Sequence, residues 1–184
     1  MGRGPLVPQS VLQFWFQDST PVQWWQVDPE FDRLIAERFS SVHERACRSE
    51  LFEWRAEPRG RLAEIIVLDQ FSRNMHRGSP LSYAHDALAL ALAQEAVSAK
   101  ADLMLPPEER VFMYLPYMHS ESRAIHEVAE QLFRERSPAS NHDFELRHKA
   151  IIDRFGRYPH RNAVLGRQST EEELAFLSLP GSSF

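Results

Sequence analysis

The chain has 184 residues, a formal net charge of −5, and a composition that is 43% hydrophobic and 26% charged. These values are typical of one soluble globular domain with a hydrophobic core. The acidic balance argues against a broad nucleic-acid-binding surface, and no apolar run approaches the ~20 residues of a membrane helix. The single cysteine, Cys47, excludes an internal disulfide. We therefore expect a cytoplasmic protein without nucleic-acid or membrane partners, folded as one domain over residues 1–184 with loose tails at 1–7 and 178–184.

The apolar residues recur at helical spacing along nearly the whole chain. In chain order, the expected helical faces lie within residues 11–16, 31–46, 62–66, 84–96, 111–115, 125–133, 144–155 and 174–177. No segment alternates convincingly with the period of two that marks a strand, and the chain has no Asn-Gly or Asp-Gly hairpin signal. The pattern predicts an all-α fold of about eight helices, paired antiparallel because the connections are short.

Local signals mark several helix boundaries. Asp28-Pro29 predicts a helix start, with Asp as the N-cap and Pro at the first helical position. Ser79-Pro80 is expected to open the small-residue helix, and Trp24-Trp25 to lie in a connection. Pro116 should interrupt its helix. Gly156 should stop another, and the capping box over residues 170–173 should start the last one.

One sequence motif, D-x-F-x-R-x-x-H-R, occurs twice, at residues 69–77 and 153–161. In the first copy, Asp69 and Arg73 continue an apolar helical face, where an unpaired charge would cost several kcal/mol. They therefore either pair with each other at a helix end or line a cleft. In the second interpretation, three neighbours would add polar groups at the rim, namely Gln70, Asn74 and Arg77.

The second copy begins a stretch that is rich in cations. It contains Arg154, Arg157, His160, Arg161 and Arg167, with Asn162 among them. Arginine suits planar, bidentate contact with a carboxylate or a phosphate. The alternative is that these cations satisfy helix carbonyls and nearby acids within the protein.

A third group, residues 117–121, contains His119 and Glu121, which are residue types used in acid–base catalysis. Neighbours in sequence point in different directions, so these two cannot form a catalytic group by themselves. The eight histidines show no metal-binding spacing, and no glycine-rich nucleotide loop is present. We expect no metal and no cofactor.

These motifs resemble a known bacterial all-helical family, the domain-of-unknown-function family 924. The resemblance rests mainly on residues 68–78, 115–121 and 155–162, with support from residues 11–16, Trp24-Trp25, Arg167 and residues 169–173. It implies a right-handed α/α superhelix of the tetratricopeptide-like kind. It implies no established activity, substrate or cofactor. One departure is Ser72, where similar proteins often have proline.

The leading functional hypothesis is a binding module with an Arg/His-lined pocket for an anionic small molecule or an acidic peptide group. The alternative is a small hydrolase or transferase in which His119 or His160 works with Glu121 or Asp69. A third interpretation is a purely structural polar network. The sequence decides neither whether the protein is an enzyme nor its oligomeric state. In the leading hypothesis, removing the charge of Arg73, Arg157 or Arg161 would abolish anion binding and leave the melting temperature nearly unchanged.

Overall fold

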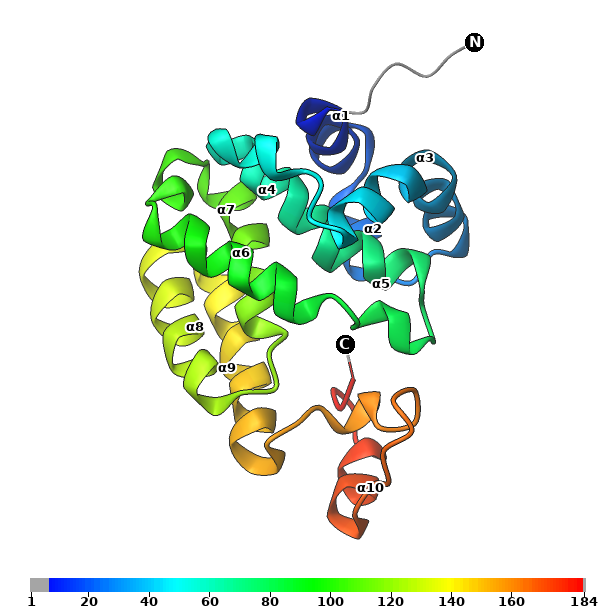
Figure 1. The fold of residues 1–184 in the computed structure, drawn as a ribbon. Coiled ribbons are helices and arrows are strands. Elements are labelled where there is room, and N and C mark those ends of the chain that lie inside the picture. The colour runs from blue at the N-terminus through cyan, green and yellow to red at the C-terminus, as the bar shows by residue number, and fades with distance from the viewer. Residues whose placement is uncertain (1–6, 184) are drawn as a thin grey trace.

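The computed structural model describes residues 7–183, and all regular structure among them is helical (Figure 1). Any expectation about residues 1–6 or 184 lies outside this range. The α-helices are α1 (Pro8–Gln13), α2 (Pro21–Trp25), α3 (Pro29–Cys47), α4 (Pro58–Ile66), α5 (Ser72–Met75), α6 (Asp86–Ser98), α7 (Pro107–Met118), α8 (Arg123–Arg136), α9 (Ala139–Phe155) and α10 (Glu171–Leu177). The predicted all-α class is confirmed.

Two helical stretches contain wide π-type turns. One, Phe14–Asp18, follows α1, and the other, Val67–Phe71, joins α4 directly to α5. The chain from Pro58 to Met75 is therefore helical throughout with a widened turn in its middle. Such turns change the direction of the side chains they carry and are frequent at functional sites. Asp69 lies inside the second of them.

The expected boundary signals at three helices are confirmed. The Asp28 carboxylate accepts hydrogen bonds from the backbone N–H groups of Glu30 and Phe31, at 3.0 and 3.2 Å. Gly156 ends α9 with a φ of +71°, which glycine adopts without strain. Thr170 and Glu173 form the capping box of α10.

Three local expectations are wrong. Helix α7 continues through Pro116 to Met118, because every residue from Val111 to Met118 is buried and this packing outweighs the lost backbone hydrogen bond. Pro80 opens only a 3₁₀ turn, and α6 begins at Asp86. The Trp24-Trp25 pair ends the short helix α2 instead of lying in a connection.

The main core is built around aromatic side chains from the N-terminal half. Phe14 and Trp15 are fully buried, and the Trp15 ring meets that of Phe112 edge-on at 5.7 Å. The ring centroids of Phe39 and Phe71 lie 4.9 Å apart. Together with the contact between the rings of Trp15 and Phe71, these contacts join the turn Phe14–Asp18, α3 and α7 to the turn Val67–Phe71, which fixes the position of Asp69 two residues before Phe71.

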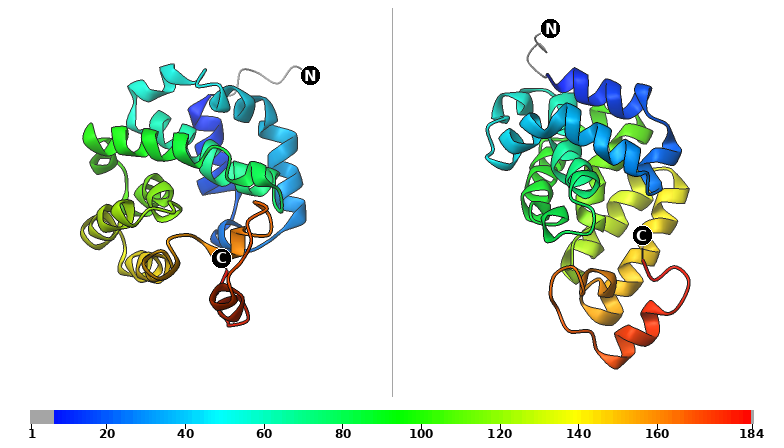
Figure 2. Two further views of the ribbon diagram at one scale, coloured as in Figure 1. Left: turned by 60° about the horizontal axis from the view of Figure 1, so that its bottom comes forward. Right: turned by 90° about the vertical axis from the view of Figure 1, so that its right-hand side faces the viewer.

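Consecutive helices in the C-terminal half pack against each other. Helix α7 contacts α8, and α8 lies beside α9 (Figure 1). Residues 137–138 connect α8 to α9, so these two helices run antiparallel. Helices α1 and α10 lie at opposite ends of the molecule in Figure 1 and in the right-hand view of Figure 2.

A second, smaller core connects α9 to α10. It contains Ile152 and Tyr158, with the rings of Phe155 and Phe176 packed 5.1 Å apart. Beyond α10, Ser182 is buried and donates to the Leu177 carbonyl at 3.1 Å. A single domain with loose ends remains a prediction.

Gly60 is required by a close backbone approach in the first turn of α4. A Cβ atom at this position would collide with the carbonyl oxygen of Trp54. Gly60→Ala is therefore expected to lower the free energy of unfolding by about 1–3 kcal/mol, the usual cost of overpacking, as measured by urea denaturation. Gly78→Asn is the control, because Gly78 has a φ of +76° that asparagine tolerates and open space around its Cβ position. Equal stability of the two variants would contradict the proposed close contact.

Candidate functional site

Asp69 is the centre of a buried polar network. Its Oδ1 atom lies 2.7 Å from Nδ1 of His119 and 3.1 Å from Nη1 of Arg73. Its Oδ2 atom accepts a hydrogen bond from Gln70 Nε2 at 2.6 Å. The carboxylate is thus fully buried yet well satisfied by donors. We call Asp69, Arg73, Asp86, His119 and Arg161 the inner cluster.

Arg73 binds two carboxylates at once. Besides Asp69, it contacts both carboxylate oxygens of Asp86 through its two Nη atoms, each at 2.9 Å. Burial acts to lower the pKa of Arg73, but the charges of Asp69 and Asp86 outweigh it and raise the pKa above its ordinary value. Burial also acts to raise the pKa of Asp69, and there the charge of Arg73 and the hydrogen bonds from His119 and Gln70 hold the pKa below its ordinary value. Both groups are therefore ionised at neutral pH.

His119 lies just beyond the end of α7 and reaches Asp69 through Nδ1. Burial and the charge of Arg73 lower its pKa, despite the attraction of Asp69. The imidazole is therefore neutral near pH 7, and because the Asp69 carboxylate can only accept, Nδ1 must carry the proton. Its other nitrogen, Nε2, makes no hydrogen bond to any residue in the range 7–183.

Arg161 comes from the 3₁₀ turn Pro159–Arg161 and is 5% exposed. Its Nη2 donates to the His119 carbonyl at 3.0 Å, while its Nη1 is 3.4 Å from Asp86. The guanidinium carbon lies 4.5 Å from the ring centroid of Tyr83 and 4.7 Å from that of Tyr158. Its Nε is buried and has no hydrogen-bond partner among the described residues. Burial and the nearby charge of Arg73 lower the pKa of Arg161, so this cation is poorly compensated.

A second network lies next to the inner cluster and contains Glu121. Both of its carboxylate oxygens bind Arg167, at 2.6 and 2.8 Å, and Oε1 also accepts from the backbone N–H of Tyr158 at 2.7 Å. Arg167 Nε donates to Asn162 Oδ1 at 2.9 Å. Because Arg161 stacks on Tyr158, the two networks are contiguous. Glu121 therefore joins the segment before α8 to Tyr158 and Arg167. It does not cap α8, which begins after Ser122.

Arg157 extends this second network toward α10. Its Nε and Nη2 atoms bind the two carboxylate oxygens of Glu173, at 2.6 and 2.8 Å. The same glutamate accepts from Asn162 and from the backbone of Thr170. The donors hold the pKa of Glu173 at about 2, the largest contribution coming from Arg157. These contacts explain how a short helix far from the main core keeps its position.

The remaining predicted residues lie in other places. Asn74 and Arg77 both bind Asp32 of α3, at distances of 2.6 to 2.9 Å. Arg154 is exposed and pairs with Glu172 at 2.8 Å. His160 is near the inner cluster, and burial lowers its pKa to about 4. The fold thus brings Asp69, Gln70, Arg73, His119 and Arg161 together, places Glu121, Arg157, Asn162 and Arg167 beside them, and directs Asn74, Arg77 and Arg154 to separate acidic partners.

Sequence reasoning missed the carboxylate partners of these cations. Asp86 and Asp32 both lie in the first turn of a helix, where an acidic residue is ordinarily explained by the helix dipole. No sequence pattern indicated that Tyr83 would contact Arg161. Tyr158 could have been found, because it lies inside the second copy of the repeated motif and next to His160.

Internal pairing argues against the expectation that charge removal would leave the melting temperature nearly unchanged. Each candidate arginine contacts a carboxylate of the protein within 3.4 Å. Removing Arg73 would leave Asp69 and Asp86 without their main counter-charge in a buried site, which is strongly destabilising. Arg161 differs, because its acidic neighbour Asp86 is already bound by Arg73.

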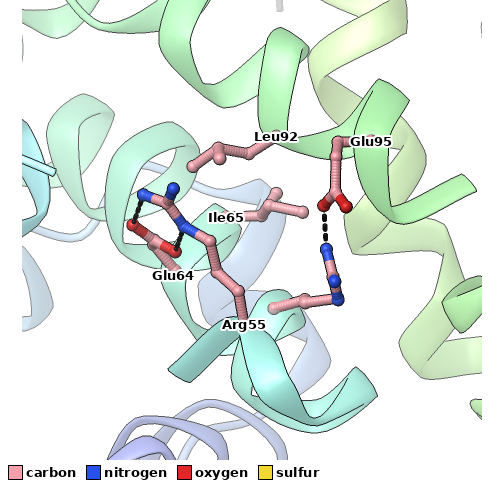
Figure 3. Close-up of a pocket in the computed structure, with 6 residues that line it drawn as sticks. Arg55, Glu64, Ile65, Leu92 and Glu95 are labelled. Atoms are coloured by element: carbon pink, nitrogen blue, oxygen red, sulfur yellow. Dashed lines mark hydrogen bonds and ion pairs between the residues drawn. The ribbon is translucent and has the colours of Figure 1, made fainter. Parts of the chain in front are cut away.

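A separate pocket lies between α4, α6 and the turn Phe52–Ala56 (Figure 3). Its two arginines are each bound to a glutamate, Arg55 to Glu64 through two 2.7 Å contacts and Arg61 to Glu95. An anionic ligand would have to displace these glutamates. The pocket is therefore a weaker candidate than the inner cluster.

These observations define an all-helical protein with a buried Asp–Arg–His network at the junction of α5, α6, α7 and the turn Pro159–Arg161. Residues 11–181 match the model of a family described as bacterial proteins of unknown function, DUF924, and the chain belongs to this family. Its structure is similar to that of a protein of unknown function from Agrobacterium tumefaciens, with 36% sequence identity and a TM-score of 0.88. The match covers 93% of this chain and 96% of that one. No curated protein matches the chain.

Two further findings apply to residues 7–183 only. None of their helices combines the length and the apolar character required to cross a membrane. They also contain no group of three or more His, Cys, Asp or Glu side chains arranged to hold a metal ion.

Proposed function

We propose that this chain is a cytoplasmic binding module of the tetratricopeptide-like kind, in which Arg161 of the inner cluster holds a small anionic molecule or an acidic peptide group. The observation that carries the proposal is the state of the Arg161 side chain. It is buried, its Nε lacks a partner among the described residues, and Asp86, the carboxylate with which it pairs, is also bound by Arg73. A buried, incompletely bonded cation is costly, and a carboxylate or phosphate oxygen would complete it.

The charge balance of the inner cluster indicates what size of ligand it would take. Asp69 and Asp86 carry two negative charges, Arg73 and Arg161 carry two positive charges, and His119 is neutral. A site without net charge does not attract large polyanions such as nucleic acids. It suits one carboxylate or phosphate group, held by directed hydrogen bonds and by the aromatic surroundings of Tyr83 and Tyr158.

The proposal is tested by titrating inorganic phosphate and succinate into wild type, Arg161→Met and Arg154→Met, with isothermal calorimetry. Methionine retains packing between the two tyrosines and leaves no acid unpaired, so the variant should fold. Loss of one charge-assisted contact is expected to weaken binding by about 10- to 100-fold. Arg154 provides the matched control, because it is an exposed arginine of the same motif that pairs with Glu172, and its variant should bind as wild type does.

Two results would overturn the proposal. One is that wild type binds neither anion. The other is that Arg161→Met binds as tightly as wild type while circular dichroism shows a folded protein. Either result would leave the inner cluster as a structural network that joins α5, α6 and α7.

A further inference from the structure

The pair formed by Asp69 and His119 is not used by anion binding at Arg161. Asp69 is buried and ionised, and it receives the Nδ1–H of His119 at 2.7 Å. The His119 side chain retains 15% of its exposure, whereas that of Asp69 retains 1%. A neutral imidazole whose Nδ1 is held by a carboxylate presents a basic Nε2 atom.

The surroundings of the pair fix its geometry from several sides. Gln70 and Arg73 hold the carboxylate of Asp69, and the π-type turn Val67–Phe71 places that carboxylate on the side of the helix that faces the end of α7. The ionised acid selects the imidazole tautomer with the proton on Nδ1, and Nε2 is left without a partner among the residues described.

Arg161 is joined to the same histidine. Its Nη2 donates to the backbone carbonyl oxygen of His119 at 3.0 Å, so the cation that would hold an anion lies against the residue that carries the imidazole. We propose that His119 is a general base for hydrolysis of a small ester that also carries a free carboxylate, with Asp69 as a positioning residue. This inference rests on the proposed function, because Arg161 would hold the carboxylate of the substrate.

The reaction needs only water and the ester. His119 Nε2 takes a proton from a water molecule as the water oxygen attacks the ester carbonyl carbon, and the carbonyl electron pair moves to its oxygen. The tetrahedral intermediate then collapses and the bond to the alcohol oxygen breaks. The leaving alkoxide takes the proton from the His119 imidazolium, so the products are a carboxylic acid and an alcohol and the base is regenerated. Asp69 stabilises the imidazolium while it exists.

The test compares wild type with His119→Asn, using para-nitrophenyl hemisuccinate as the anionic ester and para-nitrophenyl acetate as its neutral counterpart. Asparagine retains an N–H donor for Asp69 but has no base, so the buried carboxylate remains satisfied. His76→Asn is the control for replacing a histidine outside the inner cluster. We expect kcat/KM for the hemisuccinate to fall by about 100-fold or more in His119→Asn and to be unchanged in His76→Asn. Wild type should prefer the anionic ester.

Asp69→Asn supplies a second readout. It should reduce kcat more than it raises KM, and it should move the acid limb of the pH–rate profile, because the amide no longer stabilises the imidazolium. In wild type, the acid limb should lie below pH 6.5, the ordinary pKa of histidine, because burial lowers the pKa of His119.

Succinate binding, measured by calorimetry on the same samples, separates the two proposals. Catalysis is overturned, with binding intact, if wild type binds succinate but hydrolyses the hemisuccinate no faster than His119→Asn does. Both proposals fail if wild type shows neither binding nor hydrolysis. Hydrolysis that depends on His119 without succinate binding supports the base and overturns the role of Arg161.

Discussion

Arg73→Met is expected to lower the free energy of unfolding by about 3–5 kcal/mol, the cost of breaking a buried ion pair from one side. The reason is that Arg73 bonds the carboxylates of both Asp69 and Asp86, and its removal leaves the fully buried Asp69 and the partly buried Asp86 without this counter-charge. Urea denaturation followed by circular dichroism measures the loss. For a domain of ordinary stability this is a large share of the total.

Two matched variants show whether the charge is responsible. Arg33→Met removes an exposed arginine whose pairing with Glu37 is solvent-screened, and should cost less than about 1 kcal/mol. Arg73→Met combined with Asp86→Asn should cost less than the sum of the two single changes, because the second change removes one of the orphaned acids. Additive losses would show that the packing of Arg73, and not its pairing, supports the fold.

Acidification is expected to destabilise the protein between about pH 6.5 and about pH 4. Burial lowers the pKa values of His43 and His160 to about 4 and that of His148 to about 3. The unfolded chain therefore binds protons at these histidines over a range in which the folded chain does not, so stability is complete above pH 6.5 and is lost as the pH falls. Each histidine that is protonated in the unfolded chain but neutral in the folded chain lowers the free energy of unfolding by roughly 1.4 kcal/mol for every pH unit of acidification.

Three such histidines set an upper limit of roughly 4 kcal/mol lost per pH unit over this range, and residual solvent contact reduces the loss below that limit. Glu145 opposes the trend, because burial raises its pKa and the folded state there favours the proton. Urea denaturation at a series of pH values measures the slope. His148→Phe should flatten the slope by removing one titrating group, and an unchanged slope in this variant would show that His148 does not contribute.

The helices could largely be predicted from the sequence, because they depend on local signals. The apolar face behind Asp28-Pro29, the stop at Gly156 and the capping box at Thr170 all act through residues close in the chain. Where local rules failed, tertiary packing was the cause. Pro116 does not end α7, because the surrounding turns are buried on all sides.

The candidate site could be predicted only in part. The first copy of the motif offered pairing between Asp69 and Arg73 as one of two alternatives, and the structure shows this contact. The motif could not separate those residues from Arg77 or Arg154, which have the same chemistry and the same type of sequence context. Arg77 and Arg154 lie outside the inner cluster because they pair with Asp32 and Glu172, which come from distant parts of the chain.

What the sequence determined by itself is the all-helical class and the supply of arginines, histidines and aromatic residues at two copies of one motif. These are properties of composition and of spacings shorter than a few helical turns. Only the tertiary structure decided which carboxylate neutralises which cation, and that Arg161 alone among the candidate arginines has a buried nitrogen without a partner in the described chain. That outcome depends on contacts such as Arg161 with Asp86, across 75 positions of sequence, which no local pattern encodes.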